Sequence, residues 1–187
     1  FLTEKWGWST IHGPSGYQAS LNKISKDSVN LLKTTLCNED CSLAYDQLIP
    51  LNTFAQIDGQ INASVIGGNL HLIQASIGTS WQINSVDKIL FIEETNERAY
   101  RIDRVLEHLR QVGIFDRVKA VLLGDFIDKG EPDGRFLVQE IIQEFARECA
   151  FPVLQIRNIG HGQINNPLLF GTMARLQMKG SYSLEFV

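Results

Sequence analysis

Three apolar segments alternate with two amphipathic segments in the second half of the chain, and this order restricts the possible folds more than any other feature. Buried strands are expected over residues 88–92, 118–123 and 152–156. Residues 100–112 and 136–149 carry apolar side chains at the spacing of a helix. Because strands and helices alternate with short connections, parallel pairing through right-handed crossovers is predicted. The sequence therefore predicts an α/β fold.

Weaker signals surround this pattern. Ser25 is placed to cap a helix over residues 26–36. Residues 56–65 alternate between apolar and polar side chains, as a strand does, and the glycines of 67–69 are expected to end that strand. The segment 174–187 carries two short β-prone pieces on either side of a glycine.

The opening FLTEKWGW resembles the end of a helix that began earlier, so we expect the chain to start inside a larger protein. Residues 1–37 are then the end of an N-terminal domain. Residues 38–55 are polar and irregular and are expected to form a linker. Residues 56–187 form the C-terminal domain that contains the strand and helix alternation.

Composition excludes several classes of function. With 44% hydrophobic and 20% charged residues, the chain has the composition of a soluble globular protein. A net charge of −4 argues against nucleic acid and anionic membranes as partners. No apolar run approaches the roughly 20 residues that span a bilayer. An odd cysteine count fits a reducing, cytoplasmic compartment. Cys37 and Cys41 lack a second ligand pair, so no metal or other cofactor is expected.

Ligands of open parallel sheets bind beyond the carboxyl ends of the strands. At these ends the sequence places Glu93 and Glu94, then Asp125, and finally His161 between two glycines. A carboxylate beside a histidine forms two parts of a hydrolytic triad, because the carboxylate orients the imidazole and stabilises its protonated form. Glu93 and His161 are therefore candidate catalytic partners whose geometry must be tested.

Structural roles are the alternative for these side chains. An acid after a strand often caps the next helix, and Glu94 or Thr95 could serve the helix that begins near Tyr100. Asp125 is expected to anchor a loop. A single histidine is more often structural than catalytic, and three histidines are interpreted in that way: His12, His71 and His108.

A nucleophile is not evident in the chain. Ser15 lies in the glycine-rich stretch HGPSGY. A nucleophile elbow requires a helix directly after its serine, and residues 16–18 carry no helical signal. Ser15 is therefore expected to be a turn residue. The cysteines also lack a distinctive context: Cys37, Cys41 and Cys149.

Five stretches keep a common order along most of the chain: TIHGP (10–14), VIGGNLHLI (65–73), ILFIEETNERAYRIDRVLEHLR (89–110), VLLGDF (121–126) and GHGQINNPLLFGTMARL (160–176). Together they resemble the LD-carboxypeptidases, serine peptidases that include the microcin C7 self-immunity proteins. The resemblance implies a C-terminal domain of the swivelling β/β/α type, preceded by the end of a Rossmann-like N-terminal domain.

In that family the N-terminal domain carries the serine in a Gly-x-Ser-Asp turn, and the C-terminal domain carries a glutamate and a histidine. The family's glutamate falls on Glu93 and its histidine on His161, while Glu94 matches an acid outside the triad. The serine turn would precede Phe1. The resemblance thus implies that this chain holds two of three catalytic groups and is inactive by itself.

For the longer protein, the resemblance implies metal-independent removal of a terminal D-amino acid, such as D-alanine, from the murein tetrapeptide during peptidoglycan recycling. The substrate's free carboxylate needs a cationic or N–H-rich pocket. Arg98, Arg101 and Arg104 are candidates, although Arg101 and Arg104 could instead pair along the helix surface.

Two other functions stay open. A self-immunity peptidase would act on a peptidyl-nucleotide antibiotic, with pocket residues between 79 and 87. Trp81 could then be a stacking platform, although burial in the core is the favoured interpretation for this side chain. A third interpretation is a non-catalytic domain that serves dimerisation or binding. A homodimer is compatible with each of these functions.

Overall fold

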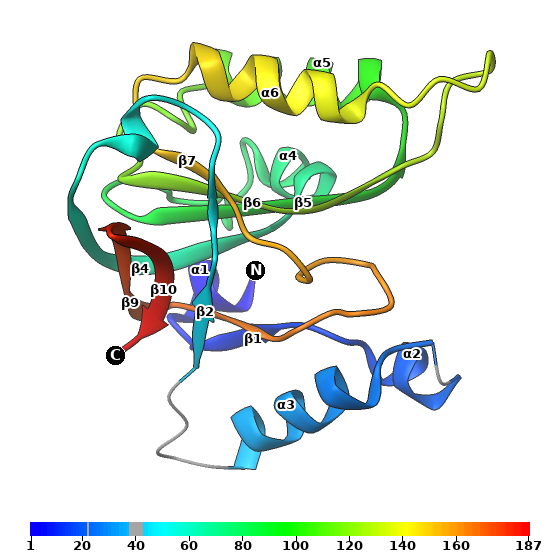
Figure 1. Cartoon of the computed structure of the whole chain (residues 1–187), viewed down its shortest axis with the longest axis vertical. Coiled ribbons are helices and arrows are strands. Elements are labelled where there is room, and N and C mark those ends of the chain that lie inside the picture. The colour runs from blue at the N-terminus through cyan, green and yellow to red at the C-terminus, as the bar shows by residue number, and fades with distance from the viewer. Residues whose placement is uncertain (22, 38–42) are drawn as a thin grey trace.

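The computed structural model describes residues 1–21, 23–37 and 43–187, and it has the predicted mixed α/β architecture (Figure 1). The helices are α1 (Leu2–Trp6), α2 (Gly16–Ser20), α3 (Lys26–Cys37), η1 (Phe54–Gln56), α4 (Leu70–Ser76), α5 (Ala99–Gln111) and α6 (Val138–Glu148). The strands are β1 (Thr10–His12), β2 (Ala44–Asp46), β3 (Ile49–Pro50), β4 (Gln60–Asn69), β5 (Ile89–Glu97), β6 (Ala120–Asp128), β7 (Val153–Gln155), β8 (Leu168–Phe170), β9 (Thr172–Lys179) and β10 (Ser181–Phe186). Among the described helices, none combines the length and the apolar composition needed to cross a membrane.

Eight of the described strands form one curled sheet in the order β2-β10-β9-β4-β5-β6-β7-β3. The neighbours β4, β5, β6 and β7 are parallel, so the parallel pairing predicted for β5, β6 and β7 is confirmed. The remaining strands of this sheet pair antiparallel. The strands β1 and β8 form a separate antiparallel pair. The predicted β-prone pieces at the end of the chain are β9 and β10.

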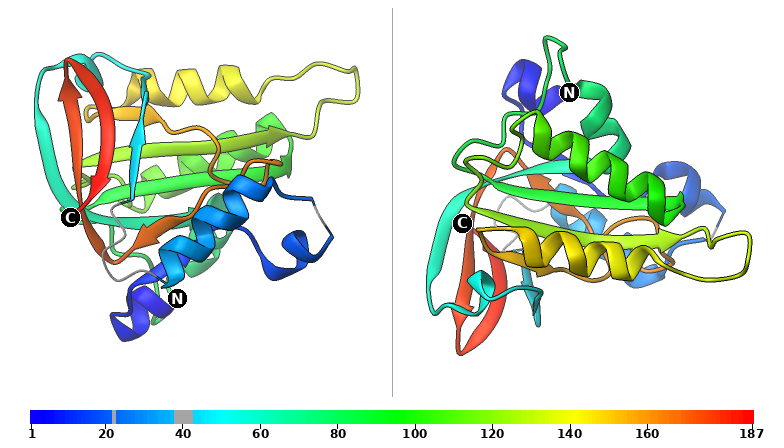
Figure 2. Two further views of the ribbon diagram at one scale, coloured as in Figure 1. Left: turned by 60° about the horizontal axis from the view of Figure 1, so that its bottom comes forward. Right: turned by 90° about the horizontal axis from the view of Figure 1, so that it is seen from above.

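The two faces of the parallel strands carry two separate cores. Helices α4, α5 and α6 pack on one face, where Leu90 and Ile92 of β5 point. The antiparallel strands and β8 pack against the other face, where Ile89 and Phe91 point. Figure 2 shows α5 and α6 lying along one side of the sheet. Successive side chains of a strand face opposite ways, so a continuous apolar run is buried on both faces.

The strand β4 begins and ends four residues later than the sequence indicated. It continues through Gly67 and Gly68 to Asn69, so the expected break at 67–69 is wrong. Gly67 pairs with Phe91 in the parallel register, and a Cβ atom on Gly67 would lie 1.9 Å from the carbonyl oxygen of Phe91. The glycine is therefore required by the close approach of the two strands and does not mark the end of one.

Residues 43–55 of the expected linker 38–55 contain the strands β2 and β3 and the start of η1. Residues 38–42 lie outside the described residues, but β2 pairs with β10 and β3 pairs with β7, at the two edges of the sheet. Short antiparallel edge strands need few apolar residues, so a polar segment can form them. The domain boundaries themselves stay a prediction.

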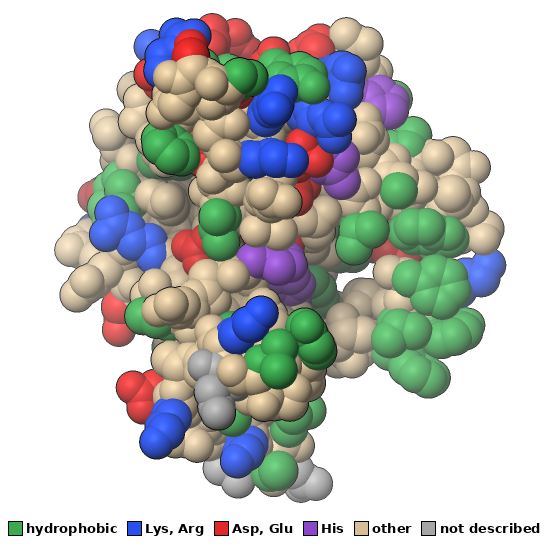
Figure 3. Space-filling model, turned by 90° about the vertical axis from the view of Figure 1, so that its right-hand side faces the viewer, with side chains coloured by type: hydrophobic (Ala, Val, Ile, Leu, Met, Phe, Trp, Pro, Cys, Tyr) green, Lys and Arg blue, Asp and Glu red, His purple; other side chains and the backbone are tan. Residues whose placement is uncertain are grey.

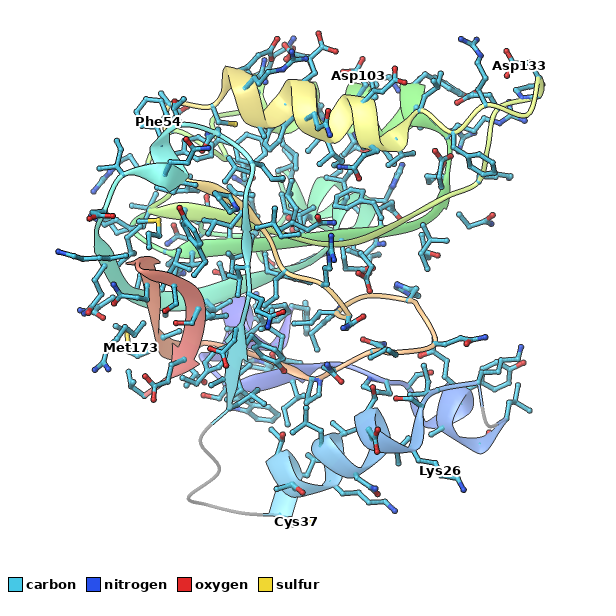
Figure 4. All side chains as sticks on the ribbon, viewed as in Figure 1. Lys26, Cys37, Phe54, Asp103, Asp133 and Met173 are labelled. Atoms are coloured by element: carbon cyan, nitrogen blue, oxygen red, sulfur yellow. The ribbon has the colours of Figure 1, made fainter. Side chains whose placement is uncertain are left out.

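The cap of α3 is confirmed, since the backbone N–H of Ser28 donates to Ser25 Oγ at 3.1 Å. The helix runs from Lys26 to Cys37, both labelled in Figure 4, along the margin of the molecule. Leu36, near the end of this helix, is 64% exposed.

Asn52 joins the chain before β4 to the end of α6. The side chain is 6% exposed. Its amide nitrogen donates to the carbonyl oxygens of Ala146 (3.0 Å) and Phe151 (2.8 Å). Its oxygen accepts from the backbone N–H groups of Ala55 (3.0 Å) and Val153 (3.2 Å). One side chain thus satisfies buried backbone groups of three segments.

We expect Asn52→Ala to lower the free energy of unfolding by about 2–4 kcal/mol, because several buried backbone groups lose their partner. Urea denaturation followed by circular dichroism measures this. Asn62→Ala, at an exposed position of β4, is the control and is expected to change stability by less than about 0.5 kcal/mol. Equal stability of the two variants would contradict the role given to Asn52.

Candidate active site

Glu93 lies in β5 at the point where the regular pairing with β6 is interrupted. Ile92 pairs with Leu123, but Glu94 pairs with Phe126, so the register shifts at this position. Such an irregularity redirects side chains locally. Glu93 is fully buried. A carboxylate in such a place requires specific partners, because burying a charge without them is costly.

His161 lies on the loop that follows β7, and Asp125 holds the start of this loop. The backbone N–H of Asp125 donates to the carbonyl oxygen of Ile159 at 2.8 Å. The Asp125 carboxylate accepts from the backbone N–H of Asn158 at 3.1 Å. The prediction that Asp125 anchors a loop is thereby confirmed. Burial raises the pKa of Asp125 above its ordinary value, and the nearby Glu93 carboxylate adds to this.

Two buried polar residues hold the far side of the same loop. Asn165 accepts from the backbone N–H of Gly160 at 3.1 Å, and its own N–H donates to Ser28 Oγ at 3.1 Å. Ser28 belongs to α3 and is fully buried, and Asn165 is 2% exposed. The sequence did not single out either residue, because serine and asparagine are common in loops and helix termini. Helix α3 thus supports the loop that carries His161.

The loop brings His161 to Glu93. The distance from His161 Nδ1 to Glu93 Oε2 is 2.7 Å, and the His161 side chain is 39% exposed. Among the described residues no hydrogen bond engages His161 Nε2, so this nitrogen is free for a reacting group. Gly160 permits the approach, because a Cβ atom there would lie 3.1 Å from Asp125 Cβ and 3.4 Å from Glu93 Oε2.

The pair changes the basicity of the histidine. The hydrogen bond that His161 donates to Glu93 is the main reason that the pKa of His161 is raised above 6.5, and partial burial opposes the change. Because the folded state favours the protonated imidazole, the pair stabilises the fold fully below pH 6.5. This contribution is lost as the pH rises through the raised pKa.

We expect the NMR titration of the His161 ring to have its midpoint above pH 6.5, and Glu93→Gln to lower that midpoint. The substitution keeps the shape of the side chain but removes the charge that stabilises the imidazolium. Glu97→Gln is the control, since Glu97 lies on the same strand and pairs with Arg101. An unchanged midpoint in Glu93→Gln would show that the two side chains do not interact in solution.

The pair lies in the wall of a cleft of about 580 Å³. Helices α1 and α4, the end of β4 and strand β1 form the rest of the wall, together with Trp81. In Figure 3, histidine side chains lie beside a hollow that hydrophobic side chains border on its other side. A carboxylate, an imidazole with one free nitrogen and an apolar cleft are together suited to general base catalysis on a bound substrate.

Residues 62–176 match the family model described as the LD-carboxypeptidase C-terminal domain. The chain belongs to the LD-carboxypeptidase family. The predicted resemblance is confirmed.

Three relatives illustrate the family likeness. A protein of Rickettsia conorii that is named as a carboxypeptidase is 37% identical over 98% of this chain and 57% of its own length. The microcin C7 self-immunity protein of Escherichia coli is 31% identical over 54% of this chain and 28% of its own length. The crystal structure of muramoyltetrapeptide carboxypeptidase from Oxalobacter formigenes superposes with a TM-score of 0.76 and 25% identity, covering 97% of this chain and 62% of that one. The chain therefore spans less than two thirds of the length of these relatives.

The predicted arginines lie away from the cleft of this LD-carboxypeptidase domain. Arg101 pairs with Glu97 at 3.2 Å, and the Arg104 guanidinium lies 5.9 Å from the centre of the Tyr100 ring. Neither these two residues nor Arg98 lines the cleft. The alternative interpretation, pairing along the helix surface, describes Arg101 and Arg104 better than carboxylate binding does.

Trp81 is not part of the core, so the favoured interpretation of this residue was wrong. It is partly exposed, lines the cleft, and makes an edge contact with Phe1 at 5.8 Å between ring centres. Nothing in the spacing of 79–87 distinguishes a cleft residue from a core residue. The surroundings of Trp81, which are Phe1 and the cleft, are visible only in the tertiary structure.

Ser15 differs from its prediction in one respect. Helix α2 begins directly after it, contrary to the expectation that no helix follows. The Ser15 hydroxyl accepts from the backbone N–H of Gln18 at 3.2 Å and caps this five-residue helix. Ser15 is not among the residues that line the cleft. Its role as a structural residue rather than a nucleophile agrees with this geometry.

Glu94 has a structural role of a different kind from the one expected. It binds the side chain of Asn69 at 2.8 Å and both the backbone N–H (3.2 Å) and the ring of His71 (2.6 Å), at the start of α4. Helix α5 begins after Arg98 without any side-chain cap. Glu94 therefore holds the helix that lines the cleft and not the helix after its own strand. In the described residues, no cluster could hold a metal ion.

Proposed function

We propose that this chain supplies the glutamate and the histidine of a Ser-Glu-His triad in a cytoplasmic LD-carboxypeptidase of peptidoglycan recycling. The single observation that supports the proposal is the 2.7 Å bond between Glu93 and His161, with Nε2 of His161 free beside a cleft. The serine would come from a part of the longer protein that precedes Phe1. Residues 1–37 would be the end of that N-terminal domain.

In the proposed reaction, the serine hydroxyl attacks the carbonyl carbon between an L-centre and the terminal D-amino acid. Nε2 of His161 takes the hydroxyl proton and gives it to the leaving amine as the C–N bond breaks, which leaves the shortened peptide as an ester on the serine. Water, deprotonated by Nε2, then attacks this ester, and the proton returns to the serine as the peptide is released. Glu93 accepts the Nδ1–H bond, which keeps Nε2 directed at the reacting atoms and stabilises the imidazolium. Backbone N–H groups would hold the oxyanion of the tetrahedral intermediate.

The test is to incubate the longer protein with murein tetrapeptide and to measure released D-alanine by mass spectrometry. Release of D-alanine without added metal is expected. The 187-residue chain alone should release none, because a triad without its nucleophile loses several orders of magnitude in rate. If the longer protein binds the peptide without cleaving it, a non-catalytic binding domain replaces the proposed enzyme.

A second substrate is favoured by the position of Trp81 in the wall of the cleft. An aromatic ring there could stack on a base of a peptidyl-nucleotide, the substrate class of a self-immunity peptidase. Adding such a compound to the tetrapeptide assay distinguishes the two. Trp81→Ala is expected to reduce cleavage of the nucleotide compound more than cleavage of the tetrapeptide.

A further inference from the structure

Glu93 has a second carboxylate oxygen that the triad does not use. While Oε2 binds His161, Oε1 is buried and has no hydrogen-bond partner among the described residues. Nε2 of His12 is in the same condition, and the two atoms are 4.0 Å apart. Buried polar atoms without partners are rare. The carboxylate oxygen accepts a hydrogen bond and the imidazole nitrogen can donate one, so these two atoms can be partners of each other.

His12 is held firmly in this position. Its strand β1 pairs with β8, with His12 opposite Leu168. The ring centre lies 5.4 Å from that of Phe91 and 5.6 Å from that of Phe170. Burial lowers the pKa of His12, although the charge of Glu93 opposes this. At neutral pH the imidazole is therefore uncharged.

A neutral imidazole carries one N–H group, and the surroundings decide which nitrogen holds it. With the proton on Nε2, the N–H group faces the unpartnered oxygen of Glu93. With the proton on Nδ1, a nitrogen lone pair would face a carboxylate oxygen in a buried site, which is unfavourable. The Nε2–H tautomer is therefore the stable form.

We propose that His12 is a positioning residue that donates its Nε2–H group to Glu93 Oε1 and so keeps Oε2 on His161. A small movement of the imidazole closes the 4.0 Å separation to hydrogen-bond distance. Glu93 is then held by two histidines, one neutral donor and one that accepts the reaction's proton. The role rests on the proposed function, because it acts through the Glu93–His161 pair.

The donor affects how strongly Glu93 stabilises the imidazolium of His161. A carboxylate that already accepts a hydrogen bond at one oxygen is a weaker acceptor at the other oxygen. Without the His12 donor, Glu93 stabilises the protonated ring of His161 more strongly, so His161 takes up its proton at higher pH. Two other carboxyls act on the pair, Glu94 and Asp125, and both are present in every protein that the test compares.

The first test uses the unsubstituted 187-residue chain with 15N-labelled histidine. The nitrogen chemical shifts of His12 are expected to report a neutral ring with the proton on Nε2 over the pH range in which His161 titrates. A neutral ring protonated on Nδ1, or a charged ring, overturns the proposal. This measurement needs no substitution, so it tests the proposed role of His12 even if a variant fails to fold.

The second test compares two substitutions. His12→Phe keeps a ring between Phe91 and Phe170 but removes the N–H donor, and His12→Gln places an amide N–H at nearly the same distance from the backbone. His12→Phe should move the His161 midpoint upward by about one pH unit. His12→Gln should leave it near that of the unsubstituted chain. Equal midpoints in all three proteins would show that His12 only packs against its neighbours, and equal upward shifts in both variants would show that a charge was lost instead of a donor.

These titrations measure no turnover, so they separate this inference from the proposed function. A longer protein that fails to release D-alanine, while His12→Phe shifts the midpoint, would end the proposed function alone. Release of D-alanine together with an unmoved midpoint in His12→Phe would end the inference alone.

Discussion

Replacing His161 with alanine is expected to lower kcat of the longer protein by about 1,000-fold or more, because no other base replaces a triad histidine. The substrate would still bind, since the cleft wall is mostly formed by other residues. The loss should therefore be in kcat, with KM changed much less. D-alanine release from the tetrapeptide, measured by mass spectrometry under steady-state conditions, gives both constants.

Two further variants make this result specific. Glu93→Gln should also lower kcat by a factor of about 100 or more, because the amide cannot stabilise the imidazolium. Glu97→Gln, on the same strand but paired with Arg101, should keep turnover within about threefold, as expected for a surface ion pair. Full activity of both His161→Ala and Glu93→Gln would refute the site.

Gly67→Ala is expected to prevent folding or to lower the free energy of unfolding by about 5 kcal/mol or more. The new methyl group would lie 1.9 Å from the carbonyl oxygen of Phe91, and Gly67 also has a φ of 151°. The atom in the way is backbone of the adjacent central strand, so no side-chain rotation relieves the clash. The strands β4 and β5 would have to separate.

Gly68→Ala is the matched control for this effect. Gly68 has a similar φ of 144°, but a Cβ atom on it would meet nothing within 4 Å. Its cost is therefore backbone strain alone, about 1–3 kcal/mol. Circular dichroism and urea denaturation of both variants compare the two. If Gly67→Ala is as stable as Gly68→Ala, the close approach of β4 and β5 does not require a glycine at position 67.

The regular part of the fold was well predicted because its signals are local. The helices expected over 100–112 and 136–149 are α5 and α6, with shifts of one or two residues at their ends. The strands expected over 88–92 and 118–123 are present but continue to Glu97 and Asp128. The apolar run ends at Ile92 in β5 and at Leu123 in β6, whereas the backbone pairing of the two strands continues beyond these residues.

The wrong predictions share one physical cause. The spacing of residue types along the sequence does not show which residues become neighbours in the folded chain. A glycine pair indicated a break, but the backbone of Phe91 required Gly67 inside a strand. Trp81 was assigned to the core, but it contacts Phe1 and lines the cleft. Capping of the helix after its strand was one possible role for Glu94, but Glu94 holds the start of α4.

The sequence by itself determined the α/β class, the parallel pairing of β5, β6 and β7 and the family, because hydrophobic periodicity and motif order are properties of the chain alone. Only the tertiary structure decided that Glu93 and His161, 68 positions apart, meet at 2.7 Å and that His12 faces the other oxygen of the same carboxylate. The reason is that strand pairing and loop anchoring bring together groups that are distant along the chain. A distance across a sheet edge depends on all the contacts that build it, and no local pattern contains that information.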